Sequence, residues 1–162
     1  MDIENIALNP IDIVEDVIYQ KKWNFSRAAD HELVAELVSS WCQYRLYFKW
    51  SKDISAISFT ITFDLKFPQS KLNSAYELLG LINETLWIGH FDITSKNGIP
   101  AYRYTVMSIS DFDLLHKKLE DLVDIGIYEC EKYYPSFHQV LFDEISAEKA
   151  LKFSNFEIIG RA

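Results

Sequence analysis

The stretch "AISFTITFDLKF", residues 56–67, alternates strictly between apolar and polar side chains. Successive side chains of a β-strand point to opposite faces of a sheet, so one face of this strand is apolar and the other is polar. This pattern is typical of an antiparallel sheet that has one face against the core and the other in water. The inward side chains are expected to be Ile57, Phe59, Ile61, Phe63 and Leu65, and the outward ones Ser58, Thr60, Thr62 and Asp64.

Further segments carry a strand pattern: residues 23–28, 31–38, 41–50, 87–93 and 99–109. The first of them is short and is expected at the edge of the sheet. The next two alternate in the same way as residues 56–67. The last two flank "TSKNG", in which Asn97–Gly98 favours a tight hairpin turn because both residue types tolerate positive φ. These runs predict a sheet of about five to six strands.

Helical patterns or capping residues mark four other segments: residues 9–23, 70–86, 110–134 and the short segment from Ser146 onward. Ser70 and Ser110 are expected to cap the second and third of these helices. Pro135 is expected to interrupt the third helix, because proline lacks the backbone N–H that a helix interior needs. The closing "NFEIIGRA", residues 155–162, shows no period that favours either a helix or a strand.

The order of elements is therefore a helix, four strands, a helix, two strands, a helix and a short helix. Strands that come in antiparallel groups, with helices segregated between them, indicate an α+β fold rather than a parallel βαβ sheet. Because only one face of the strands is apolar, the helices are expected to pack on one side of the sheet. The chain has no long linker and no internal repeat, which predicts a single domain over residues 1–162.

Composition narrows the environment and the partners of the chain. Its formal net charge is −8, which repels phosphate backbones and anionic lipids, so neither nucleic acid nor a membrane is an expected partner. The first ten residues lack the basic and apolar regions of a signal peptide, and no apolar run is long enough to cross a bilayer. Cys42 and Cys130 follow no metal or redox spacing and are expected to be buried free thiols. These features predict a cytoplasmic protein.

The sequence contains no complete motif of a catalytic or cofactor site. Its histidines, His31, His90, His116 and His138, lack the spacing of metal ligands, so no metal is predicted. The glycine-rich phosphate-binding patterns and the G-x-S-x-G nucleophile motif are also missing. We therefore expect neither a cofactor nor an enzyme.

One pair of residues offers an alternative. His90 and Asp92 stand two positions apart on an expected strand, so their side chains share a face and the carboxylate could orient the imidazole. A small enzyme or a small-molecule sensor could use such a pair, although no serine or cysteine stands in a recognisable activating context. The structural explanation is a hydrogen bond between the two residues, or a polar rim around Trp87. In that interpretation Trp87 and Phe91 pack into the core.

Aromatic and arginine side chains gather on neighbouring expected strands: Trp41, Tyr44 and Arg45 in "WCQYR", and Tyr102 and Arg103 in "AYRY". Tryptophan, tyrosine and arginine are the residue types enriched at interface hot spots. A sheet face held together by internal Arg–Asp pairs is equally well supported, with Asp64 and Asp92 available. The two interpretations stay open at this point.

Several stretches together resemble the YbjN family, in particular its alpha-proteobacterial type: "WCQYRLYF", "NETLWIGHFD", "GIPAYRY", "ECEKYYPSFHQV" and the closing "EKAL" and "GRA". They occur in family order over nearly the whole chain. The family is described as bacterial sensory transduction regulators, without a strongly typed catalytic signature. The resemblance implies a fold similar to type III secretion chaperones, in which helices pack on an antiparallel sheet.

The resemblance also implies a small cytoplasmic adaptor or chaperone-like regulator that works through protein contacts. Type III secretion chaperones are typically dimers that hold an extended partner segment along grooves or strand edges. A homodimer is therefore an open alternative for this chain. The expected function is non-enzymatic binding of a protein or peptide, with these contact residues: Trp41, Tyr44, Arg45, Trp87, His90, Asp92 and Arg103.

Overall fold

The computed structural model describes residues 9–107 and 111–159. Its elements in chain order are α1 (Pro10–Gln20), β1 (Asn24–Ala29), β2 (Glu32–Val38), β3 (Gln43–Ser51), β4 (Ala56–Thr62), a 3-10 turn (Gln69–Lys71), α2 (Leu72–Asn83), β5 (His90–Ile93), β6 (Pro100–Met107), α3 (Phe112–Phe142) and α4 (Ala147–Ile159). The predicted order of helices and strands is confirmed. The predicted end of the last strand at Ile109 lies outside the described residues.

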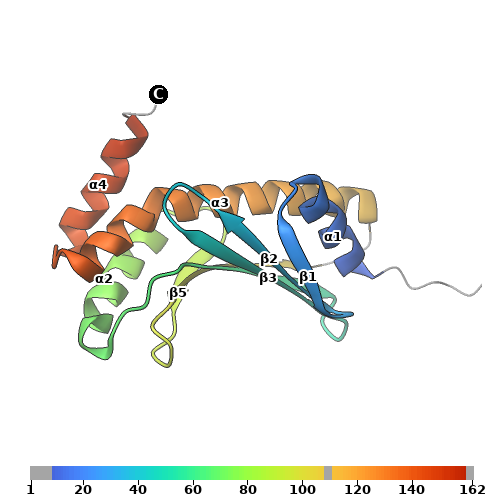
Figure 1. The fold of residues 1–162 in the computed structure, drawn as a ribbon, viewed down its shortest axis with the longest axis horizontal. Helices are drawn as coiled ribbons and strands as arrows, with labels where there is room; N and C mark the ends of the chain where they lie inside the picture. The colour runs from blue at the N-terminus through green and yellow to red at the C-terminus, as the bar shows by residue number, and fades with distance from the viewer. Residues whose placement is uncertain (1–8, 108–110, 160–162) are drawn as a thin grey trace, which may run out of the picture.

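The strands form one six-stranded sheet in the order β1-β2-β3-β4-β6-β5, and every neighbouring pair is antiparallel. Figure 1 shows the long helix α3 lying across one face of this sheet, with α1 toward one end and α2 and α4 toward the other. The α+β class and the packing of helices on one side are therefore confirmed. Among the described helices, none combines the length and apolar character that a bilayer crossing requires.

The alternation in residues 56–67 places the core as predicted. Ile57, Phe59 and Ile61 of β4 are buried beneath the helices, and the residues between them face the opposite side. The strand itself ends at Thr62, earlier than the pattern suggested. The alternation continues because backbone bonds still join residues 63–67 to the β5–β6 hairpin, which keeps their apolar side chains turned inward.

Helix α3 differs from the prediction at its start and in its length. Its N-cap is Asp111, whose carboxylate accepts a hydrogen bond from the backbone N–H of Leu114 at 3.1 Å. The predicted cap Ser110 lies outside the described residues. Pro135 does not interrupt the helix, which continues to Phe142. Proline removes one backbone bond, and we attribute the continuity of the helix to its buried aromatic side chains on either side of this position.

The starts of α2 and α4 decide two further predictions. Ser70 does not cap α2, because it lies within the 3-10 turn and the helix that follows has no side-chain cap. Ser146 precedes α4, and its hydroxyl accepts a hydrogen bond from the backbone N–H of Lys149 at 3.4 Å. α4 then includes the first five residues of "NFEIIGRA", for which the sequence showed no period.

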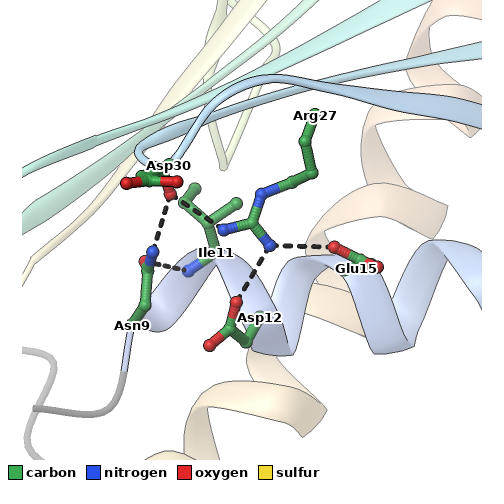
Figure 2. A network of polar contacts seen from close by, with 6 residues as sticks. All are labelled: Asn9, Ile11, Asp12, Glu15, Arg27 and Asp30. Atoms are coloured by element: carbon green, nitrogen blue, oxygen red, sulfur yellow. Dashed lines mark hydrogen bonds and ion pairs between the residues drawn. The ribbon is translucent and has the colours of Figure 1, made fainter.

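Polar contacts join the start of α1 to the turn between β1 and β2 (Figure 2). Arg27 donates hydrogen bonds to the carboxylates of Asp12 at 2.9 Å and Glu15 at 2.8 Å. It also donates to the backbone carbonyl of Asp30 at 2.9 Å, and Asn9 donates to the same carbonyl at 2.6 Å. One arginine therefore holds α1 against the edge strand β1.

Both cysteines are buried and free, as expected. Burial raises the pKa of the Cys42 thiol to about 12 and the pKa of the Cys130 thiol well above its ordinary value. A thiol with such a pKa stays protonated at neutral pH, and the thiolate is the reactive form. Cys42 and Cys130 therefore act as small core residues.

Candidate functional site

Two of the predicted contact residues lie on the side of the sheet that the helices cover, Tyr44 within β3 and Trp41 in the loop before it. Tyr44 is 0% exposed, and its ring packs edge-on against Phe63 and Tyr134. Trp41 is partly buried and stacks on Tyr134 with the ring centroids 6.3 Å apart. The burial of Tyr44 contradicts the prediction that it contacts a partner, because no surface of this side chain is available. Its residue type suggested a hot spot, but its position on β3 places it in the core.

The other face of the sheet carries a hollow with a volume of about 570 Å³. Arg45 reaches it from β3 and Arg103 from β6, so two arginines that are far apart in sequence share one concavity. The lining otherwise consists mainly of polar side chains of β3, β4 and the β5–β6 hairpin: Gln43, Tyr47, Thr60, Thr62, Asp64, Asp92, Thr94 and Asn97. This hollow is the candidate functional site.

Both arginines of the hollow are paired with acidic side chains. Nε of Arg103 lies 2.9 Å from Oδ2 of Asp92, and Nη2 of Arg45 lies 3.2 Å from Oε1 of Glu36. The Tyr47 side chain and then the Glu36 carboxylate raise the pKa of Arg45. The proposed internal Arg–Asp pairing is therefore confirmed for Asp92. It is wrong for Asp64, whose carboxylate accepts a hydrogen bond from the hydroxyl of Tyr134 at 3.3 Å.

His90 and Asp92 do share the outer face of β5, as the strand spacing predicted. The expected contact between the Asp92 carboxylate and the His90 imidazole is replaced by an ion pair between Asp92 and Arg103 on the neighbouring strand. His90 is exposed and lies opposite Arg103 in the strand register. In the parts of the chain that the structure describes, no group of three or more His, Cys, Asp or Glu residues is arranged to hold a metal ion.

Trp87 lies in the loop between α2 and β5 and is 100% exposed. The interpretation that it packs into the core is therefore wrong, whereas Phe91 is buried as expected. The chain turns at Gly89, where φ is +71° and an added Cβ would lie 2.8 Å from the backbone oxygen of Arg103. Next to it, the hydroxyl of Tyr102 donates a hydrogen bond to the carbonyl of Ile88 at 2.7 Å. This turn leaves the indole of Trp87 in solvent.

The sequence did not point to Asn83, which protects the edge strand β5. Its side-chain oxygen accepts a hydrogen bond from the backbone N–H of Phe91 at 2.8 Å, and its side-chain nitrogen donates to the Phe91 carbonyl at 3.0 Å. A single side chain therefore occupies both outward backbone groups of Phe91. An unpaired strand edge invites pairing with another chain, and this contact blocks that pairing at Phe91.

Replacing Asn83 by alanine is expected to lower the free energy of unfolding by about 2 kcal/mol, because a part-buried N–H and a carbonyl both lose their partner. Urea denaturation followed by circular dichroism would measure the change. Asn73→Ala is the matched control, since Asn73 is exposed on the same helix and should change stability by less than about 0.5 kcal/mol. Equal stability of the two variants would contradict a stabilising role for the Asn83–Phe91 contact.

Comparison with known proteins bears on the family of the chain. A family model described as "YbjN: Putative bacterial sensory transduction regulator" matches residues 10–139. A solved structure described as "Crystal structure of YbjN, a putative transcription regulator from E. coli" aligns at 11% identity with a TM-score of 0.48, over 76% of this chain and 93% of that one. Among curated proteins, none is similar enough to count as a match.

The family description names a regulator and no catalytic activity. Residues 10–139 include β1 to β6, α1, α2 and nearly all of α3, so the match covers the whole sheet and the candidate site. A match over this much of the chain shows the family, and the protein belongs to the YbjN family.

Proposed function

We propose that this chain is a non-enzymatic regulator that binds a protein or peptide partner at the outer, helix-free face of its sheet. The observation that carries the proposal is the hollow of about 570 Å³ on that face, which two arginines, a tyrosine and several threonines line. Arginine and tyrosine recur at interface hot spots. The proposal extends the family description from a regulator to a protein that acts by contact, in the manner of type III secretion chaperones and within the cytoplasm.

Side-chain exposure supports this use of the outer face. The side chains of Arg103 and Arg45 are 41% and 55% exposed although each pairs with an acid. A half-exposed ion pair in water contributes little net stability, so a hydrogen-bond acceptor of a partner, such as a backbone carbonyl, can replace the internal acid at small cost. Trp87 adds a fully exposed indole ahead of β5. In this proposal, Arg45, Trp87, His90, Asp92 and Arg103 contact the partner. Trp41 is left out, because its ring stacks on Tyr134 of α3 on the other side of the sheet.

The alternative function is a small-molecule sensor or a small enzyme that uses His90 and Asp92. Asp92 does line the hollow, which favours a ligand of limited size there. Its carboxylate is engaged by Arg103, however, and is not available to orient His90 in this arrangement. Binding of a partner is therefore the better supported of the two functions.

Alanine at Arg103 or at Trp87 is expected to reduce capture of the specific partner at least about tenfold, the size of effect that removal of a hot-spot side chain has. The measurement is an affinity pull-down from the native lysate with tagged wild-type and variant chains, quantified by mass spectrometry. Because Trp87 is fully exposed and Arg103 half-exposed, neither variant should lower the melting temperature by more than a few degrees.

Matched controls are available on the same chain. Tyr19→Ala removes an aromatic side chain that is 73% exposed on α1, and Lys52→Ala removes an exposed cation from the turn between β3 and β4. Both controls should capture the partner as the wild type does. If all variants capture the same proteins in the same amounts, the outer face is not the binding surface and the His90–Asp92 alternative gains support.

A further inference from the structure

Half of strand β6 has a neighbour on only one side. β4 pairs with β6 from Ala101 to Met107, whereas β5 pairs only with the segment Pro100–Arg103. The segment Tyr104–Met107 therefore continues past the end of β5. Within the described residues no strand lies on its second side.

The backbone groups that face this open side can be assigned. The backbone N–H of Phe63 donates to the carbonyl of Pro100 at 3.2 Å, so this carbonyl points to the side of β4. Residues of an antiparallel strand alternate in the side to which their N–H and C=O groups point. Tyr104 and Val106 thus bond to β4, and Thr105 and Met107 present their N–H and C=O groups to the open side. Over residues 9–107 and 111–159, no hydrogen bond to these outward groups is found.

Within the part of the chain that the structure describes, this edge lacks the features that protect the other edges of the sheet. Natural edge strands are blunted by charge, proline or a covering side chain. On β5 the Asn83 side chain covers Phe91, and on β1 the side chain of Arg27 is held against α1. The open segment reads "YTVM", which contains neither charge nor proline and consists mainly of residues that favour strands.

We infer that Tyr104–Met107 is the acceptor edge for an extended, basic segment of a partner protein, which adds to the sheet as a strand in line with β5. The inference rests on the proposed function and specifies how the partner binds. Unpaired N–H and C=O groups at strand spacing require an extended polypeptide, because its backbone offers the complementary groups at the same spacing. The formal net charge of −8 favours a partner segment that carries lysine or arginine.

The side chains around the edge define the pattern of that segment. Tyr104 is partly buried and Val106 is buried, on the side of the sheet that the helices cover. Side chains of the added strand on that side are therefore expected to be apolar. Side chains of the added strand on the outer face lie beside Thr105 and Met107, which are exposed, and these positions take the basic residues. In the strand register His90, the first residue of β5, lies opposite Arg103, the residue before the open segment. The loop that carries Trp87 therefore enters β5 next to the open segment. A second copy of this chain is disfavoured, because it also carries −8.

The probe is a fluorescein-labelled ten-residue peptide of alternating valine and lysine, and anisotropy measures its binding to the full chain. Thr105→Pro removes the outward N–H but keeps the bonds to β4, which Tyr104 and Val106 make, and proline is tolerated on edge strands. Thr105→Pro should weaken peptide binding at least about tenfold, because one backbone hydrogen bond is lost and the proline ring disturbs the fit of the peptide to the edge. Thr105→Val keeps the N–H and should bind within about twofold of wild type. A valine–glutamate peptide should bind at least about tenfold more weakly.

Amide hydrogen exchange on the wild-type chain tests the same inference without a variant. Adding the valine–lysine peptide should slow exchange at the N–H groups of Thr105 and Met107. Protection at Phe25 and Arg27 of β1 instead, no binding to the wild-type chain, or equal binding by Thr105→Pro would overturn the inference. So would a dimer of this chain that Thr105→Pro abolishes, since a second copy would then occupy the edge.

The outcome is separable from that of the proposed function. If Thr105→Pro captures the native partner as the wild type does while Arg103→Ala and Trp87→Ala lose it, the partner binds the outer face and not this edge. The proposed function then stands and the acceptor edge falls. If the peptide binds at the edge but Arg103→Ala and Trp87→Ala keep every partner, the edge stands and the outer-face contact falls.

Discussion

Replacing Phe91 by alanine is expected to lower the free energy of unfolding by about 4 kcal/mol, within the range for deletion of a buried aromatic ring. Phe91 is 2% exposed, and its ring lies 5.5 Å from that of Tyr102, 5.7 Å from that of Tyr133 and 5.6 Å from that of Phe137, measured between centroids. The cavity would open where β5 meets α3, so neighbouring rings would lose contacts that only partial collapse could restore.

The Phe91→Ala effect would be measured by urea denaturation against Phe142→Ala. Phe142 is 59% exposed at the end of α3, and its truncation should cost less than about 1 kcal/mol. Since β5 carries Asp92, loosening of this strand should also disturb the Asp92–Arg103 pair and weaken partner capture. A Phe91→Ala variant as stable as the wild type would show that the aromatic cluster does not hold β5 in place.

Gly98→Ala is expected to destabilise the protein by roughly 3 kcal/mol. Gly98 has a φ of +68°, a conformation that costs a residue with a Cβ roughly 1–2 kcal/mol. An added Cβ would also overlap the backbone oxygen of Phe67, which cannot move aside as a flexible side chain would. Gly98 further accepts a hydrogen bond from the N–H of Phe67 at 2.8 Å and donates one to Thr94 at 2.8 Å. Relief of the overlap would break contacts that position the β5–β6 hairpin.

Gly80→Ala is the matched control for this substitution. Apart from the adjoining backbone of α2 itself, no atom lies within 4 Å of a Cβ built at Gly80, which stands inside this helix. Alanine there should raise the free energy of unfolding by about 0.5–1 kcal/mol, because it restricts the unfolded chain and favours the helix. Thermal and urea melts of both variants should therefore move in opposite directions. A shift of the same sign and size in both would exclude a specific role for the backbone at Gly98.

Much of the sheet could be predicted because its signal is local. Alternation in β3 and β4 alone shows which side chains face the helices, and the buried and exposed residues follow it. The same alternation places Tyr44 beside Leu46 on the inner face. The prediction that Tyr44 contacts a partner came from its residue type and was wrong, because strand position decides exposure. For Arg45, one position later, residue type and strand position agree, and its side chain is on the surface.

Rules that concern one residue failed where packing was stronger. Pro135 lies inside α3 although proline disfavours a helix interior, and Ser70 does not cap the helix that it precedes. Local rules carry energies of about one to a few kcal/mol, and at Pro135 the burial of the surrounding face of α3 outweighs that cost. The contrast with Ser146, which does cap α4, shows that sequence identifies candidates for caps but not which of them are used.

The sequence by itself determined the type and order of the elements, the apolar face of the sheet, and through its motifs the family. Only the tertiary structure decided the strand order, the pairing of Arg103 with Asp92, the exposure of Trp87, and the open half of β6. The physical reason is the distance along the chain over which each feature is determined. Hydrophobic periodicity is a property of neighbouring residues, whereas strand edges and surface pairs depend on where segments far apart in the chain come to lie, which the packing of the whole core determines.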